Sequence, residues 1–182
     1  MNKMKSKLIG IGILFLLLIL SSCRSEKKKE ISEKSFPVII ERFDSDKLKQ
    51  SDTTTLTIRE NDTLSLHLYG VHYEENIEIN MGHAFEINKE DESQILINKI
   101  PSKLIAEKQY FYEHQNIIVK KYYYDIKNEI DEEGFFFVAN NRIIAFNSTA
   151  WNLYNFYNYE NSEINKILRK DTTDFFNHWN KN

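Results

Sequence analysis

The sequence predicts an α+β protein that is mainly β: an antiparallel meander, folded as a sandwich or a barrel, with C-terminal helices packed on it. Two observations support this fold class. From residue 36 to residue 146, short apolar runs alternate with turn residues at close spacing, as in antiparallel strands. After residue 148, apolar residues recur at helical spacing. Strands followed by helices favour an antiparallel sheet that helices cover on one side.

The expected strands number eight to ten. Within the clearest run, Leu64, Leu66 and Leu68 alternate with Ser65, His67 and Tyr69, and Gly70 predicts a bulge or sharp bend. Pro101 indicates a boundary before a long pair of strands. The runs lie at residues 36–43, 54–60, 64–73, 77–80, 84–88, 94–98, 103–113, 116–126 and, as one hairpin, 135–146.

The hairpin at residues 135–146 has the strongest local signal. Asn140 and Asn141 tolerate the positive φ that a two-residue type I′ turn requires. That turn would set Ala139 opposite Arg142, and Phe137 opposite Ile144. Both faces are then apolar, with Phe135, Phe137 and Ile144 on one and Phe136, Val138 and Ile143 on the other. We therefore expect both faces to be buried, one in a sheet core and one under a helix or second sheet.

Three residues with helix-capping side chains divide the C-terminal region: Ser148, Ser162 and Asp171. Each precedes apolar residues at helical spacing. We therefore expect two helices and a last turn packed on the sheet. The apolar residues are Trp151, Tyr154 and Tyr157 in the first segment, Ile164, Ile167 and Leu168 in the second, and Phe175, Phe176 and Trp179 in the third.

The N-terminus reads as an export signal. Three lysines occur in residues 1–7, and the next thirteen residues, 8–20, carry no charge. A membrane-spanning helix needs about 20 apolar residues, so this run has the length of a secretory signal core. It ends in Leu20-Ser21-Ser22-Cys23, which resembles the lipobox of bacterial lipoproteins: a branched apolar residue, two small residues and a cysteine.

The resemblance implies a lipid anchor on Cys23. A diacylglycerol would be attached to its sulfur, signal peptidase would cut between Ser22 and Cys23, and the new amino terminus would carry a further acyl chain such as palmitate. An uncleaved signal anchor, or secretion with an incidental cysteine, is the alternative. We expect a signal peptide at 1–22, a lipidated cysteine with a flexible tether at 23–36, and a single β-rich domain at 37–182.

The same resemblance places the protein in the cell envelope of a diderm bacterium. Some surface-exposed lipoproteins carry an acidic run directly after the cysteine, whereas Ser25-Glu26 is followed here by three lysines. The departure favours a periplasm-facing protein over a surface-exposed one. The lipid bilayer, contacted through acylated Cys23, is thus its first expected partner.

Composition excludes several classes of function. Cys23 is the only cysteine, so its acylation removes cysteine catalysis, disulfides and thiolate metal sites. Residues 37–182 hold 16 basic and 24 acidic residues, and such an acidic body argues against nucleic acid. Five glycines leave little room for a phosphate-binding glycine loop. We expect no cofactor and lean against an enzyme.

The histidines and carboxylates form no recognisable catalytic or metal motif. A metal site built from His72, Glu74 and His83 is conceivable, and a bulge at Gly70 could align His67 with His72. Surface histidines on a polar strand face explain the same pattern better. We therefore predict neither catalytic nor metal-ligating residues.

The aromatic content suggests binding: the chain has 12 Phe, 10 Tyr and 2 Trp. Tyr122, Tyr123, Tyr124 and Trp151 are possible interface residues, although consecutive tyrosines in a strand must point to both faces. We expect a non-enzymatic binding domain for a protein partner, either an immunity-type protein or an accessory subunit. A lipocalin-like carrier of a small apolar ligand or glycan is the alternative, and a hydrolase ranks last.

Overall fold

The computed structural model describes residues 31–74, 77–80, 84–112, 114–127, 133–151, 153–159 and 163–176. The chain divides into two units, residues 1–30 and 31–182, and the described residues all belong to the second. Cys23 and the signal segment lie outside the described residues, so the lipid anchor stays a prediction. No helix in the described ranges has the length and hydropathy needed to cross a membrane.

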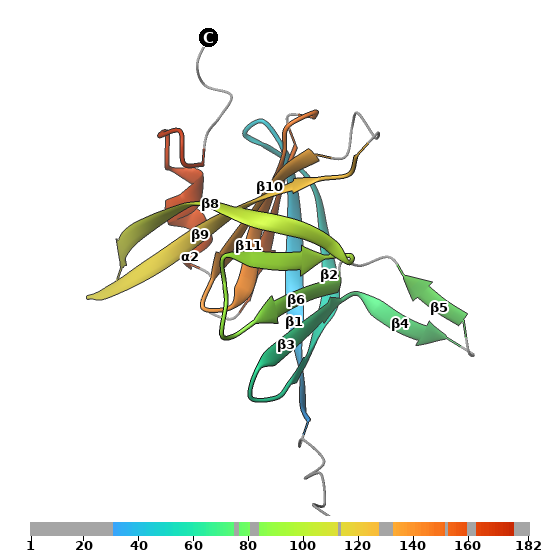
Figure 1. Ribbon diagram of the computed structural model, residues 1–182. Helices are drawn as coiled ribbons and strands as arrows, with labels where there is room; N and C mark the ends of the chain where they lie inside the picture. Colours follow the sequence, from blue (N-terminus) through green and yellow to red (C-terminus); the bar gives the residue numbers. More distant parts are fainter. Residues whose placement is uncertain are drawn as a thin grey trace, which may run out of the picture. The chain divides into compact units, whose positions relative to one another are not determined.

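Ten strands of the described chain close into an antiparallel barrel (Figure 1). Barrel neighbours follow the order of the chain, and pairing of the first strand with the last closes the ring. This closure decides between the two expected architectures in favour of the barrel. The strands are β1 (Ser32–Asp44), β2 (Lys47–Glu60), β3 (Leu64–Tyr69), β6 (Ala84–Asn88), β7 (Gln94–Ile97), β8 (Ile100–Tyr112), β9 (Gln115–Asp125), β10 (Glu133–Ala139), β11 (Arg142–Ser148) and β12 (Leu153–Asn158).

A separate two-stranded sheet interrupts the meander. It consists of β4 (Val71–Glu74) and β5 (Ile77–Asn80), which pair with each other between β3 and β6 in the chain. Gly70 separates β3 from β4 with a φ of 70°, which confirms the bend expected there. Glycine adopts this left-handed conformation without the steric penalty of a Cβ atom.

The expected strands are present, but several boundaries differ. β2 begins at Lys47 instead of residue 54, and the run expected at 64–73 is divided into β3 and β4, which belong to separate sheets. β8 begins at Ile100, so Pro101 lies inside the strand opposite Leu96 instead of before it. β1 begins at Ser32, and residues 32–36, which we expected in the tether, pair with β2 and belong to the barrel. The polar composition of residues 32–35 hid this part of the strand, because backbone pairing with β2 needs no apolar side chain.

The prediction of a first C-terminal helix after Ser148 is wrong. Leu153–Asn158 forms β12, which pairs with β1 on one side and β11 on the other. Asparagine and aromatic residues are weak helix formers, and the backbone hydrogen bonds of two ladders outweigh the helical spacing. The second is confirmed as α2 (Glu163–Arg169), while residues 174–176 after Asp171 form a turn. Ser162, the expected cap of α2, lies outside the described residues. The part of the chain described is thus mainly β, with one short helix.

The β10–β11 hairpin follows the expected design with one irregularity. Asn140 and Asn141 have φ values of 50° and 58°, and Ala139 pairs with Arg142 as expected. A register shift between Phe137 and Val138 then sets Phe137 opposite Ala145 instead of Ile144. The expected division of the two faces is confirmed by two separate buried clusters.

The first cluster fills the barrel, because strands from all round the ring contribute to it. Its largest fully buried side chains are those of Tyr69, Phe85, Tyr122, Phe136 and Tyr157. The second cluster lies on the outside, where Leu168 of α2 and Phe176 cover Phe137 and Phe156. Aromatic side chains thus occupy the interior space in which a lipocalin-like carrier would hold an apolar ligand.

Candidate functional site

One end of the barrel holds a small polar hollow, called here the mouth pocket. It lies where β1 begins and β2 turns into β3 (Figure 1), next to the β10–β11 turn. Its volume is about 220 Å³. The lining residues are Lys34, Phe36, Ile58, Glu60, Ser65, His67, Asn140, Asn141 and Arg142.

His67 forms the buried wall of the mouth pocket. Its side chain is 2% exposed and packs edge-on against Phe85, with ring centroids 5.9 Å apart. Nε2 shares a hydrogen bond of 2.8 Å with the Ser65 hydroxyl, and Nδ1 is buried with no partner among the described residues. The expectation that His67 lies on the surface is therefore wrong. The alternation of β3 is as predicted, but Ser65, His67 and Tyr69 form its buried face.

The electrostatic environment keeps His67 neutral. Burial is the main cause that lowers the pKa of His67, to about 4, and the nearby charges of Arg142 and Lys89 act in the same direction. Glu60 opposes them, but its carboxylate is engaged by Lys89, whose Nζ lies 2.9 Å from Oε2. His67 is thus a neutral imidazole at pH 7, in surroundings where positive charge prevails.

Ser65 and His67 have the separation of a nucleophile and its general base, but their surroundings suit catalysis poorly. A catalytic histidine is oriented by a third group at its other nitrogen, and Nδ1 has no partner among the described residues. With its pKa near 4, His67 is also a weaker base than a free imidazole. The arrangement therefore gives no support to a hydrolase.

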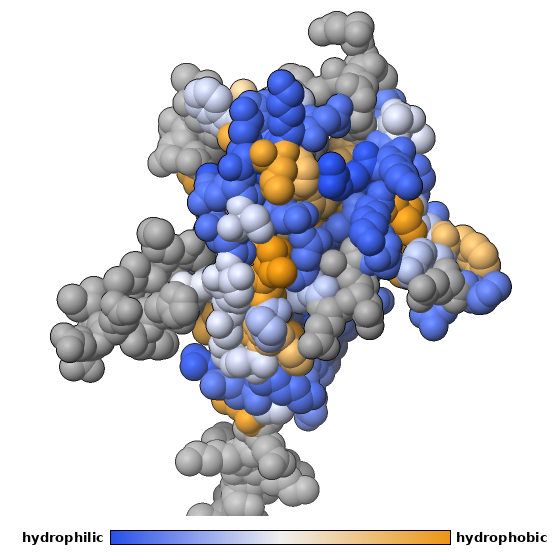
Figure 2. Space-filling model, turned by 180° about the vertical axis from the view of Figure 1, so that it is seen from behind, coloured by the Kyte–Doolittle hydropathy of each residue, from blue (hydrophilic) through white to orange (hydrophobic). Residues whose placement is uncertain are grey.

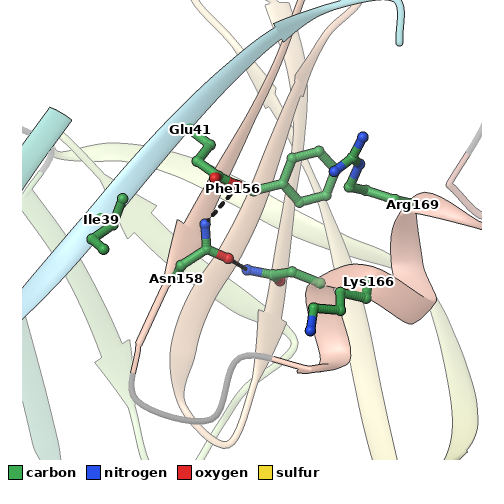
Figure 3. Close-up of a pocket in the computed structure, with 7 residues that line it drawn as sticks. Ile39, Glu41, Phe156, Asn158, Lys166 and Arg169 are labelled. Carbon is green, nitrogen blue, oxygen red and sulfur yellow. Dashed lines mark hydrogen bonds between the residues drawn. The ribbon is translucent and has the colours of Figure 1, made fainter. Parts of the chain in front are cut away.

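A second hollow lies outside the barrel between β1, β12 and α2, with a volume of about 340 Å³ (Figure 3). Its polar groups mostly pair with one another. Asn165 donates from Nδ2 to the Tyr157 carbonyl and to Asn158 Oδ1, both at 2.9 Å, and Asn158 donates to Glu41 at 3.0 Å. Arg169 lies 4.0 Å from the Phe43 ring centroid. These contacts attach α2 to the barrel, so we interpret the hollow as structural.

The β8–β9 ladder extends past its neighbours in the barrel. β7 pairs with β8 only from Ile100 to Lys103, and β10 pairs with β9 only from Val119 to Asp125. Beyond these points β8 and β9 pair with each other as far as Tyr112 and Gln115. Along this extension the outer edges of both strands have no barrel neighbour in the described part of the chain.

The structure separates the four residues proposed for an interface. Tyr122 and Tyr124 are buried in the barrel, where the Tyr122 hydroxyl donates to the Glu92 carbonyl at 2.8 Å. They offer no surface to a partner. Tyr123 points outward and donates to Glu133 at 2.5 Å, and Trp151 is largely exposed. Contact of these two with a partner stays a prediction.

The histidine metal site also stays a prediction. The side chains of His72, Glu74 and His83 lie outside the described residues. Among the residues that the structure does describe, no three histidine or acidic side chains lie close enough together to hold a metal ion.

Comparison of the chain with protein-family models, with characterised proteins and with solved structures found no match. Its function is therefore argued from its own geometry. Sequence reasoning missed the mouth pocket because the lining residues come from four separate stretches. One signal was available: His67 alternates with Leu66 and Leu68 in a strand whose buried face the sequence does not specify.

Proposed function

We propose that this chain is a lipid-anchored envelope protein whose barrel is a non-enzymatic binding domain for a protein partner. The anchor is acylated Cys23, and the proposed docking element is the β8–β9 extension. Support for the anchor comes from the lipobox-like residues at 20–23. Support for binding comes from the open edge of β8, which is the observation that carries the proposal.

The open edge of β8 runs from Ile105 to Phe111. In an antiparallel strand, alternate residues direct their N–H and C=O groups to the same side, so these seven residues present about three positions that no strand in the described ranges pairs with. Such an edge is a template on which an extended segment of another protein can add a strand. The occupant we propose is therefore an extended segment of the partner protein.

Exposed apolar side chains accompany this edge. Phe111 is 70% exposed and Ile118 is 52% exposed. Phe111 pairs with Asn116 and Ile118 with Gln109, so the two side chains are diagonal neighbours on one face of the ladder. Figure 2, which shows the molecule from behind, has hydrophobic surface in several separate patches between hydrophilic residues.

β2 also has an open edge, and the residues along it differ from those along the β8 edge. β3 pairs with β2 only from Leu56 to Glu60, which leaves residues 47–54 without a second neighbour among the described strands. This stretch reads KLKQSDTT and is rich in lysine and other polar residues. Charged residues, lysine above all, protect edge strands against pairing with other chains. The β8 edge, which reads IAEKQYF, has one glutamate and one lysine, and the ammonium group of that lysine is already paired with Asp171.

The acidic body narrows the kind of partner. Residues 37–182 carry more acidic than basic residues, which would speed encounter with a basic protein by electrostatic steering. An immunity-type protein that neutralises a basic toxin and an accessory subunit of an envelope complex both fit. The carrier of an apolar ligand fits less well, because aromatic side chains fill the barrel.

A capture experiment tests the proposal. The mature protein, extracted from membranes in mild detergent, is used as bait in envelope extract, together with the variants Phe111→Asp and Ile118→Asp. Leu48→Asp is the matched control, because Leu48 is also 52% exposed but lies on the protected β2 edge. We expect a protein that the wild type and Leu48→Asp recover and that the two ladder variants lose at least tenfold. The docking site would be contradicted if Phe111→Asp and Ile118→Asp both recovered as much of the partner protein as the wild type. It would also be contradicted if the wild type captured no specific protein.

A further inference from the structure

We propose that the mouth pocket binds a small oxyanion, a phosphate or carboxylate group, between Arg142, Lys34 and the Asn140–Asn141 turn. The site is independent of the β8–β9 extension. It adds a small-molecule ligand to a domain for which a protein partner is proposed above.

The charges of the mouth pocket favour an anion. Lys34 and Arg142 both line it, and neither forms an ion pair with a carboxylate in the described part of the chain. Glu60, the acidic residue of the lining, is held by Lys89, which also donates to the Asn61 carbonyl at 2.9 Å. The charge of Lys34 also acts on Glu60, so the lining holds two cations against a single carboxylate that Lys89 already engages.

Arg142 is held in place before any ligand arrives. Its guanidinium carbon lies 4.9 Å from the ring centroid of Phe36 and 5.3 Å from that of Tyr159. Tyr159 is itself fixed, because its hydroxyl donates to the Ile143 carbonyl at 2.7 Å and shares a hydrogen bond of 2.6 Å with Tyr69. A guanidinium stacked on aromatic rings keeps its N–H edge for paired hydrogen bonds to an oxyanion. Less ordering entropy is then lost on binding.

The buried wall of the pocket has an unmet polar group. Nδ1 of His67 is buried and has no partner among the described residues, and leaving such a group unsatisfied costs about 1–3 kcal/mol. The volume of about 220 Å³ corresponds to about seven waters at about 30 Å³ each. A phosphate group with part of its hydration shell fits that space. The negative charge would offset the positive surroundings of His67.

The oxyanion has two possible sources, a free anion or a lipid headgroup. β1 begins at the mouth, and Cys23 precedes Ser32 by only nine residues. At about 3.3–3.6 Å per residue, an acylated Cys23 would hold the mouth within about 30 Å of the bilayer. Headgroup phosphates would then be within reach of Lys34 and Arg142. This route rests on the proposed lipid anchor, whereas binding of a free anion does not.

The test is titration calorimetry on the mature protein in a neutral detergent. The probes are inorganic phosphate, acetate and glycerophosphoglycerol, the deacylated headgroup of phosphatidylglycerol. Arg142→Gln and Lys34→Gln remove one cation each from the mouth pocket. Lys47→Gln is the matched control, because it removes an exposed cation at the β1–β2 hairpin, outside the pocket lining. Circular dichroism checks that each variant keeps the strand content of the wild type. NMR follows the titration of His67 with and without phosphate.

We expect at least one probe to bind, with affinity falling tenfold or more in Arg142→Gln, severalfold in Lys34→Gln and less than twofold in Lys47→Gln. We also expect bound anion to raise the pKa of His67, which a surface charge effect far from the pocket would not do. Tighter binding of glycerophosphoglycerol than of phosphate assigns the site to a headgroup, and the reverse assigns it to a free anion. Failure of all three probes, or equal losses in Lys47→Gln and Arg142→Gln, would overturn the proposal.

Discussion

Lys108 on β8 lies 2.8 Å from the carboxylate of Asp171, sixty-three positions later in the chain. Tyr110 donates to the same carboxylate, and Thr173 donates to it from its backbone N–H at 2.8 Å and its hydroxyl at 2.6 Å. Asp171 is thereby buried and fully paired. It fastens the segment after α2 to the outside of the barrel, where Phe175 and Phe176 pack on Phe137.

Replacing this carboxylate should loosen the C-terminal segment. Burial by itself would raise the pKa of Asp171, but hydrogen bonds from Lys108, Thr173 and Tyr110 outweigh it and lower the pKa to about 2. Because the folded pKa lies below the unfolded value of 3.8, the stabilisation is complete above pH 4 and is lost as the pH falls to 2. We expect Asp171→Asn to lower the free energy of unfolding by about 2 kcal/mol at pH 7.

Urea denaturation at pH 7 and pH 2 measures this effect. The difference between Asp171→Asn and the wild type should shrink at the lower pH, because the wild-type carboxylate is then partly protonated. Asp46→Asn, at an exposed turn position, is the control and should differ little from the wild type at either pH. If the variant and the wild type differed in free energy of unfolding by the same amount at pH 7 and pH 2, the charge of Asp171 would contribute nothing to stability.

His67 should make the free energy of unfolding depend on pH in a higher range than Asp171 does. Its folded pKa of about 4 lies below the unfolded value of 6.5, so the unfolded chain binds the proton more readily. Stability therefore falls as the pH drops from 6.5 to 4, by about 3 kcal/mol in total. The charged groups acting on the ring are Arg142 from β11, Glu60 from β2 and Lys89 after β6.

The variant His67→Gln removes this titration. We expect its free energy of unfolding to change less between pH 6.5 and pH 4 than that of the wild type, whatever its stability at pH 7. His114→Gln, which removes an exposed histidine, is the matched control. Parallel curves for the wild type and His67→Gln would show that His67 does not titrate as its burial implies.

Gly134 should not tolerate even a methyl group. A Cβ atom at this position would lie 2.5 Å from the Asn147 carbonyl oxygen and 2.6 Å from the Phe146 ring. The carbonyl belongs to the neighbouring strand and cannot move without disturbing the β10–β11 ladder. We expect Gly134→Ala to destabilise the barrel by about 1–3 kcal/mol, as overpacking does in other cores. A melting temperature equal to that of the wild type would contradict this close packing.

The lipid anchor has a direct test in cells. Cys23→Ala should abolish incorporation of labelled palmitate and leave the precursor uncut, so that it migrates more slowly than the mature protein. Ser25→Ala is a suitable control, because it alters a residue near the cleavage site without removing the cysteine. Normal maturation and unchanged membrane partition in Cys23→Ala would exclude the lipobox interpretation.

Local sequence signals determined most strand positions and the β10–β11 turn. The alternation of β3, the turn at Asn140-Asn141 and the bend at Gly70 depend on neighbours in the chain, so a single sequence contains them. The same holds for α2, whose apolar residues face one side. Residues 151–157 misled because their spacing suits a helix, while their asparagines and aromatic side chains are compatible with a strand.

Only the tertiary structure decided how these elements meet. The pairing of β1 with β12 joins residues more than a hundred positions apart and closes the barrel, and no local signal specifies such a pairing. Closure of the ring also determined which face of β3 is buried. The buried face carries Ser65, His67 and Tyr69, and the leucines lie on the other face. The mouth pocket follows from that choice, because Lys34, Glu60, His67 and Arg142 come together only once the ring is closed.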